Sequence, residues 1–141
     1  AVMTTSNPIN ISRIDHVVIR VNNLEAMIDW YCKVLGYRLE RGPGQARLAQ
    51  LRAGQSLLDL VDVNGALGQA RGGPPDQLAP NMDHLCLQVV PWDTEAIRDH
   101  LRRQQVEAGE AQQRYGARGR GPSMVLQDPE GNVIELKGNL Q

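Results

Sequence analysis

The sequence predicts an α+β fold made of two similar βαβββ modules, and three features of the chain support this prediction. An Asp-His pair stands in the same place in two similar stretches, IDHVVIRV at 14–21 and MDHLCLQV at 82–89. Apolar residues at helical spacing follow each stretch. Each half then closes on an alternating segment, LDL at 58–60 and IEL at 134–136. Because the three echoes occur in the same order, they indicate a duplicated module.

Composition and charge exclude several classes of partner. The 141 residues carry a formal net charge of -1, and the sequence pI is about 6.3. Such a chain has no overall field to attract nucleic acid or an anionic membrane, and it lacks an apolar run of the roughly 18 residues that a membrane helix needs. Two cysteines are too few for a disulfide framework. No charged segment followed by an apolar one opens the chain, so we expect a cytoplasmic protein with a small-molecule partner.

The length fits one domain, which the composition divides into four parts. Residues 1–12 show no periodicity and predict a flexible N-terminal arm. The first βαβββ module is expected at 13–63 and the second at 82–138, with a linker rich in Gly and Pro at 64–81. One module of about 60 residues would be marginal alone. We therefore expect both modules to share one core in a single domain at 13–138.

The first module begins with a short, β-branched strand at 14–21. Asn23 is a suitable N-cap for a helix, apolar residues recur at helical spacing from Leu24 to Leu35, and Gly36 provides a stop. Tight turns that contain Gly then separate three strands, which the sequence predicts at 37–42, 46–52 and 55–63.

The second module repeats this order. It begins with a strand at 82–90, and an Asp93 cap then precedes a more charged helix at about 94–104. The residues DPEG at 128–131 are typical of a type I turn. This turn joins the last two of three strands, which are predicted at about 106–115, 122–127 and 132–137.

Strand parity places four potential metal ligands on matching surfaces. Successive residues of a strand point to opposite faces, and in the first strand of each module one face is wholly apolar and suits the helix. His16 and His84 lie on the other face, while Asp59 and Glu135 alternate with apolar neighbours in the closing strands. We therefore expect these four side chains to line one concave cavity.

This residue set suits a divalent cation. A carboxylate withdrawn from water costs several kcal/mol unless a donor or an opposite charge compensates it. Two imidazoles with two carboxylates suit zinc, nickel, cobalt, manganese or iron(II), without selecting one. The plainer alternatives are hydrogen-bonded histidines and carboxylates paired with arginine. The matched places of the four residues in two repeated modules favour the metal.

Two groups of arginines are candidates for contact with a substrate. Arg20 lies four residues after His16 on the same strand face, where it can hold an anionic substrate group or form a salt bridge within the sheet. Arg114, Arg118 and Arg120 lie in the stretch RYGARGRGP. This stretch is expected to be either a solvated loop or a mobile basic lid.

Four further polar residues are assigned no chemistry. Asp15 and Asp83 precede the two histidines, and we expect them to point away from these as structural residues at the strand ends. Cys86 is interpreted as a small core residue. His100 is interpreted as part of the solvated face of its helix.

Two passages of the sequence resemble the vicinal oxygen chelate superfamily, which includes glyoxalase I, extradiol dioxygenases, fosfomycin-resistance thiol transferases and bleomycin-binding proteins. The first is similar to the opening of bacterial glyoxalase I, and the second to the closing hairpin of the family; they read IDHVVIRVNNLEAMIDWYCKVLGYRL and GPSMVLQDPEGNVIELKG. The resemblance spans 13–138. It implies a cupped, partly closed mixed sheet and a homodimer.

The resemblance also implies roles for particular residues. The ligand positions of glyoxalase I correspond to His16, Asp59, His84 and Glu135, and the arginine that helps to hold glutathione corresponds to Arg20. The family usually has Glu where this chain has Asp59. The sequence leaves open whether one cavity forms within a chain or across two chains.

Three functions follow from this reading. The leading one is a metal-dependent, glyoxalase I-like lyase or isomerase acting on a thiohemiacetal through an enediolate, with glutathione as co-substrate and Glu135 as the proton shuttle. The second is a ring-cleaving dioxygenase with iron held by His16, His84 and Glu135. The third is a binding module that sequesters a drug or metabolite without catalysis.

Overall fold

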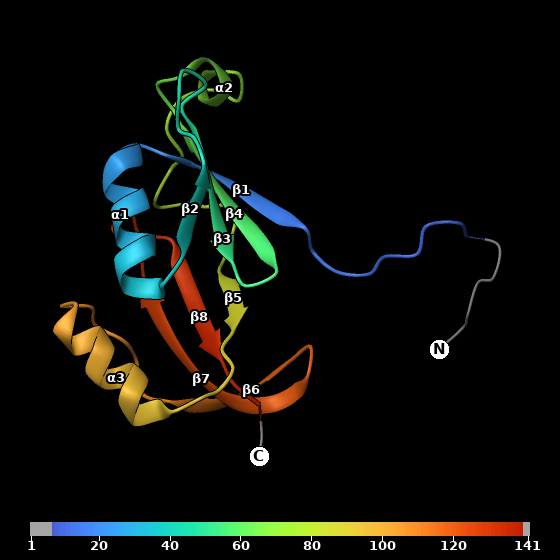
Figure 1. Cartoon of the computed structure of the whole chain (residues 1–141), viewed down its shortest axis with the longest axis vertical. Helices are drawn as coiled ribbons and strands as arrows, with labels where there is room; N and C mark the ends of the chain where they lie inside the picture. The colour runs from blue at the N-terminus through green and yellow to red at the C-terminus, as the bar shows by residue number, and fades with distance from the viewer. Residues whose placement is uncertain (1–6, 140–141) are drawn as a thin grey trace.

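The computed structural model describes residues 7–139. The first six residues of the predicted N-terminal arm and the last two residues of the chain lie outside the described part. Two four-stranded mixed sheets with few helices confirm the predicted α+β class with paired βαβββ modules (Figure 1). The two sheets remain separate rather than closing into one barrel.

The first module forms sheet A, in the strand order β1-β4-β3-β2. β1 and β4 pair in parallel, and the other pairs are antiparallel. Helix α1 (Leu24–Leu35) connects β1 to β2. The strands are β1 (His16–Val21), β2 (Arg38–Arg41), β3 (Leu48–Ala53) and β4 (Ser56–Asp62).

The second module forms sheet B with the same topology, in the order β5-β8-β7-β6. Helix α3 (Thr94–Arg103) again follows the first strand, and a short helix α2 (Ala66–Gln69), which was not predicted, lies in the linker between the modules. The strands are β5 (Leu85–Gln88), β6 (Gln112–Gly116), β7 (Gly119–Gln127) and β8 (Val133–Lys137).

Capping residues mark the helix boundaries that the sequence predicts. The Asn23 side chain accepts the backbone N–H of Ala26 at 3.1 Å, and Gly36 follows α1 in the left-handed conformation with φ of 72°. Asp93 caps α3 in the same way through Ala96. Among the described residues 7–139, no helix combines the length and apolar character needed to cross a bilayer.

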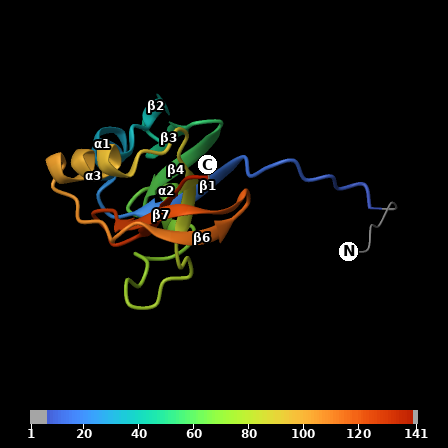
Figure 2. The ribbon, with the colours of Figure 1, turned by 90° about the horizontal axis from the view of Figure 1, so that it is seen from below.

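One hydrophobic core extends across both modules. Helices α1 and α3 lie on the same side of the two sheets (Figures 1 and 2). The buried residues of α1 pack in one cluster with apolar side chains of both sheets and with Leu101 of α3. Each module therefore completes the hydrophobic core of the other. A single module of about 60 residues would bury too little apolar surface to be stable alone.

The stretch that carries Arg114, Arg118 and Arg120 is a β-hairpin rather than the expected loop, and Arg118 and Arg120 are exposed to solvent. β6 and β7 pair along this stretch, with Arg114 opposite Gly121, and β7 begins three residues earlier than predicted. The predicted strand at 106–115 is correspondingly shorter, because β6 begins at Gln112.

The glycines that suggested a loop are needed for close packing within this hairpin. The aliphatic part of the Lys137 side chain lies against Gly116, where a Cβ would come within 3.0 Å of two of its carbons. An added Cβ on Gly121 would collide with the carbonyl oxygen of Gly138. The Lys137 ammonium group donates to the carbonyl oxygens of Gly119 at 2.8 Å and Gly138 at 3.2 Å.

The turn at 128–131 joins the second module to helix α1. The buried Tyr31 hydroxyl donates to Asp128 Oδ2 at 2.7 Å, and burial followed by the Asp128 charge raises the pKa of Tyr31. The Glu130 carboxylate accepts the backbone N–H groups of Asn22 and Asn23, each at 2.8 Å. A carboxylate of one module therefore stabilises the N-terminus of the other module's helix.

His100 also joins the modules, so its interpretation as part of a solvated face is wrong. The residue is half-buried, and its Nε2 lies 2.8 Å from the carbonyl oxygen of Val34 near the end of α1. Because a carbonyl oxygen can only accept, Nε2 carries the hydrogen. Helical periodicity in α3 gave no sign of this contact, which depends on where the other module's helix ends.

Replacing Glu130 should weaken the junction between the modules. Glu130→Gln removes the charge from a group that accepts two backbone N–H bonds at a helix N-terminus. We expect the free energy of unfolding to fall by about 1–2 kcal/mol in urea titrations. Glu107→Gln, at an exposed position, is the matched control and should stay within about 0.5 kcal/mol of the parent. Equal stability of both variants would contradict the assigned contact.

Candidate functional site

The two predicted histidines lie on the sheet faces opposite the helices. Burial alternates along β1, where Val17 and Ile19 are half-buried while His16 and Val18 are exposed. β5 alternates in the same sense, with Leu85 and Leu87 more buried than Cys86 and Gln88. This agrees with the predicted parity. The site therefore has to be assembled on the faces that helices α1 and α3 leave uncovered.

His84 and Glu135 form the first pair of candidate ligands. Glu135 is only 7 % exposed, and its Oε1 lies 3.3 Å from His84 Nε2. The backbone sets this pair, because Glu135 is in register with Cys86, two residues beyond His84 on the neighbouring parallel strand. Two bonds of about 2.1 Å at a tetrahedral angle would hold their donor atoms roughly 3.4 Å apart. The observed spacing therefore fits two ligands of one cation.

His16 and Asp59 form the second pair, at the same offset in sheet A. Asp59 is in register with Val18, two residues beyond His16. Its carboxylate is 3 % exposed; Oδ2 accepts a hydrogen bond from the Gln50 amide at 3.2 Å, and Oδ1 has no hydrogen-bond partner among residues 7–139. A buried carboxylate with one neutral donor is poorly compensated. This oxygen is therefore suited to accept a cation.

The four residues form two separate pairs within one chain. Over residues 7–139, no three His, Cys, Asp or Glu side chains come together in a cluster that could hold a metal ion. The histidine of each pair lies on or directly before an edge strand of its sheet, β1 in sheet A and β5 in sheet B. Sequence parity assigned each residue to a face, whereas the distance between the two sheets depends on tertiary structure.

Asp15 and Asp83 contact the histidines, so the expectation that they point away is wrong. Asp15 Oδ1 lies 2.7 Å from His16 Nδ1, and Asp83 Oδ2 lies 2.7 Å from His84 Nδ1. Both aspartates precede the strands, where the alternation of faces does not yet constrain the side chain. In the sequence, the repeated Asp-His dipeptide was a feature that could have indicated these contacts. The hydrogen bond to Asp15, followed by the charge of Asp59, raises the pKa of His16.

Cys86 is exposed, so its interpretation as a core residue is wrong. It shares the face of His84 and lies opposite Glu135 in the ladder. Partial desolvation, followed by the charge of Glu135, raises the pKa of the Cys86 thiol to about 11. The group therefore stays a neutral thiol near pH 7 and is a poor nucleophile there.

Arg20 contacts the linker between the modules. Its Nη1 donates to the carbonyl oxygens of Gly73 at 2.8 Å and Gly72 at 3.2 Å, and lies 3.5 Å from that of Gly68. A Cβ on Gly68 would collide with the backbone at Asp62, so the linker lies directly against the end of β4. Arg20 thus helps to hold the linker beside sheet A.

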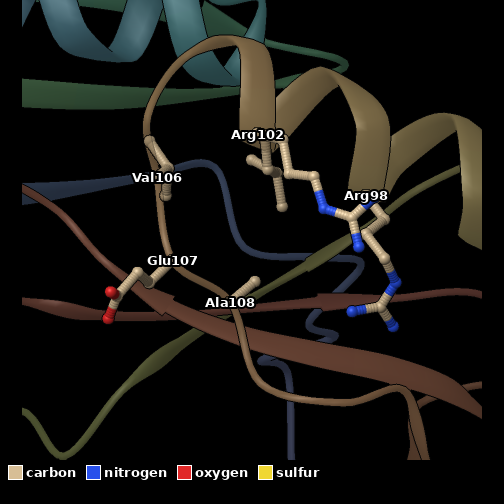
Figure 3. A pocket seen from close by; sticks show the side chains of 6 residues that line it. Arg98, Arg102, Val106, Glu107 and Ala108 are labelled. Carbon is tan, nitrogen blue, oxygen red and sulfur yellow. The ribbon is translucent and has the colours of Figure 1, made fainter.

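Two surface hollows lie away from the candidate ligands. One hollow, of about 360 Å³, lies between α3 and residues 106–108. Figure 3 shows the Arg98 and Arg102 side chains projecting from α3 on one side of it and Val106 on the other. A larger hollow of about 680 Å³ lies between Trp30 and β7. None of the four candidate ligands lines either hollow. The chemistry proposed below therefore belongs to the uncovered sheet faces.

Two βαβββ modules in paired mixed sheets define a class of fold that binds small molecules and is often dimeric. Residues 13–136 match the Glyoxalase/Bleomycin resistance protein/Dioxygenase superfamily, and the chain belongs to this family. The resemblance recognised in the sequence is thereby confirmed. Members of this superfamily commonly bind a divalent metal ion.

Solved structures of the same fold have diverse functions. An integron cassette protein from V. cholerae is 23% identical, with a TM-score of 0.72, over 94% of this chain and 98% of that one. Lactoylglutathione lyase from Agrobacterium tumefaciens is 19% identical, with a TM-score of 0.66, over 94% and 96%. An antibiotic-binding protein from Streptomyces sp. CB03234 is 21% identical, with a TM-score of 0.69, over 94% and 99%. At these identities the similarity establishes the fold alone.

Proposed function

We propose that this chain is a metal-dependent, glyoxalase I-like lyase or isomerase for a small oxygen-bearing substrate of the thiohemiacetal class. The observation that carries the proposal is the pair of buried carboxylates, Asp59 and Glu135, each beside a histidine at the same strand offset. A nickel, zinc, cobalt, manganese or iron(II) ion held by His16, Asp59, His84 and Glu135 would compensate these charges and polarise two neighbouring substrate oxygens.

Glu135 is the proposed catalytic base. Its carboxylate takes the proton from the carbon that bears the thiohemiacetal hydroxyl and returns it to the adjacent carbonyl carbon, while the hydroxyl proton passes to the former carbonyl oxygen, so the isomerisation involves no net change of oxidation state. The packing that leaves Glu135 only 7 % exposed limits the exchange of that proton with solvent. The nearby Cys86 thiol remains neutral near pH 7 and takes no part in this transfer.

Charge on the same face of sheet A supports an anionic substrate. Arg52 is in register with Leu57, which is in register with His16, so Arg52 shares the face of the candidate ligand. Arg38 lies opposite Arg52, and Glu40 pairs with Arg52 at 2.8 Å. The two guanidinium groups suit the carboxylates of a glutathione adduct. Arg20 is a further proposed contact for such a group.

We further propose that each complete site combines pairs from two chains of a homodimer. The histidines lie beside β1 and β5, which are terminal strands of their sheets within residues 7–139, and terminal strands are common places for a second copy to dock. If the His16–Asp59 pair of one chain faces the His84–Glu135 pair of another, a two-fold symmetric dimer has two equivalent four-ligand sites. Such an arrangement accounts for the separation of the two pairs within one chain.

Turnover of the thiohemiacetal formed from methylglyoxal and glutathione tests the proposed activity. Protein loaded in turn with nickel, zinc, cobalt, manganese and iron(II) should convert it with at least one metal. Glu135→Gln should lower kcat by roughly 10²-fold or more, because it removes the proton acceptor. Glu107→Gln changes an exposed glutamate in the same way and should leave kcat unchanged. Absence of turnover in all five fully loaded forms would contradict the proposal.

A metal-independent binding module is the second candidate, favoured by the separation of the two pairs over residues 7–139. In this case the uncovered faces sequester a ligand without any chemical step. Elemental analysis and ligand titration of the same purified protein separate the candidates. Tight binding of a drug or metabolite by protein that takes up none of the five metals would favour this second function.

A further inference from the structure

A carboxylate is placed on the same ring nitrogen of both candidate histidine ligands. Asp15 contacts Nδ1 of His16 and Asp83 contacts Nδ1 of His84, each at 2.7 Å. The two contacts belong to separate sheets and arise from different segments of the chain. Their repetition at equivalent positions is not expected of incidental surface pairs.

The contact determines which nitrogen of each neutral imidazole carries the hydrogen. An ionised carboxylate only accepts hydrogen bonds, so Nδ1 must carry the hydrogen, and Nε2 is left with the lone pair that a metal ligand needs. In sheet B the 2.7 Å contact of Nδ1 with Asp83 is a hydrogen bond, whereas Nε2 lies 3.3 Å from Glu135 Oε1, which is longer than an ordinary N–H···O hydrogen bond. The aspartate thus selects the nitrogen that faces the buried carboxylate of its own pair.

We propose that Asp15 and Asp83 are positioning residues that fix the tautomer and the orientation of His16 and His84, so that Nε2 is the ligating atom. The inference deepens the proposed function and rests on it for the identity of the bound group. A carboxylate behind a ligating imidazole also raises the basicity of the other nitrogen, and loss of such a partner typically weakens metal binding 10–100-fold. Neither aspartate is assigned contact with a substrate.

A contribution to fold stability alone would behave differently. The Asp15 and Asp83 side chains are 90% and 96% exposed, and exposed ion pairs contribute little to the free energy of unfolding. The charge of Asp15 also helps to raise the pKa of Arg52, after the larger effect of Glu40. We therefore expect Asp15→Ala and Asp83→Ala to leave the melting temperature within about 2 °C of the parent.

Long-range ¹H–¹⁵N spectra of metal-free protein with labelled histidine provide the first test. At about pH 8, where imidazole is ordinarily neutral, His16 and His84 should show the Nδ1–H tautomer. His100 is an internal reference, because its Nε2 contacts the Val34 carbonyl and must carry the hydrogen. Asp15→Ala should remove the preference for the Nδ1–H tautomer at His16 alone. Asp83→Ala should remove it at His84 alone. Nε2–H signals for His16 and His84 in the parent would overturn the proposal.

Cobalt(II) titration of the same proteins provides the second test. The double variant Asp15→Ala/Asp83→Ala should bind cobalt at least about 10-fold more weakly than the parent. Asp29→Ala removes an exposed carboxylate paired with Lys33 on α1 and should have no effect. Unchanged cobalt affinity in the double variant would contradict the inference while leaving the proposed function intact. A parent that binds no cobalt or other metal would contradict the proposed function, and the spectra would still decide whether the aspartates fix the tautomers.

Discussion

His16→Ala and His84→Ala proteins, each inactive alone, should regain activity when their chains are mixed. Every site of either variant dimer lacks one histidine ligand if pairs from two chains combine. In a mixed dimer, one site lacks both histidines and the other has its full ligand set. Random exchange makes half of the dimers mixed, so about a quarter of the parental activity and bound metal should return.

Each chain of the mixture can be tagged differently, so that the mixed dimer is isolated and its metal content measured directly. The informative control is a chain with both substitutions, His16→Ala and His84→Ala, mixed with either single variant, because no pairing of these chains completes a site. Recovery in this control would point to an artefact. Activity of the single variants that does not rise on mixing would show that each site belongs to one chain.

Gly121→Ala should destabilise the protein more than any surface change described above. The added Cβ would meet the carbonyl oxygen of Gly138, a backbone atom held in place because the Gly138 N–H donates to the Pro122 carbonyl at 2.8 Å. The C-terminal end of β8 would have to move away from β7. Overpacking of this kind costs about 3 kcal/mol. For a chain of this size, this corresponds to a melting temperature lower by roughly 10 °C.

Gly73→Ala is the matched control for this substitution. A Cβ at Gly73 would have no neighbour within 4 Å in the part of the chain that the structure describes, and the Gly73 φ is outside the left-handed region. Its stability should equal the parent or rise by up to about 1 kcal/mol, because alanine restricts the unfolded chain. Calorimetric scans of the three proteins make the comparison. A Gly121→Ala protein as stable as the control would contradict the hairpin packing.

Most secondary structure could be predicted because its signals are local. Asn23, Gly36 and Asp93 satisfy helix ends through neighbouring residues, and both helices begin and end close to the predicted positions. The hairpin at 112–127 was misjudged because its glycines resemble loop residues in a linear reading. Their function is to let the Lys137 side chain and the Gly138 backbone approach, and a contact with another strand leaves no local pattern.

The candidate site likewise has features that local sequence predicted and features that depend on tertiary structure. Alternation along a strand determined that His16 and His84 share a face with their carboxylates, because the strand repeat of two residues is a local property. The contacts of Asp15 and Asp83 lie at the strand ends, where this repeat stops. The contact of each aspartate with Nδ1 of its histidine therefore became clear only from the tertiary structure.

The amino-acid order alone was enough to establish a duplicated α+β module and the family, since both depend on short-range patterns and on their repetition along the chain. The tertiary structure was needed to learn that the four ligand candidates form two pairs in residues 7–139 rather than one cluster. It also showed that Arg20 and His100 bind backbone carbonyls. The physical reason is that the distance between two sheets depends on how their helices and turns pack, and no periodicity within a strand encodes it.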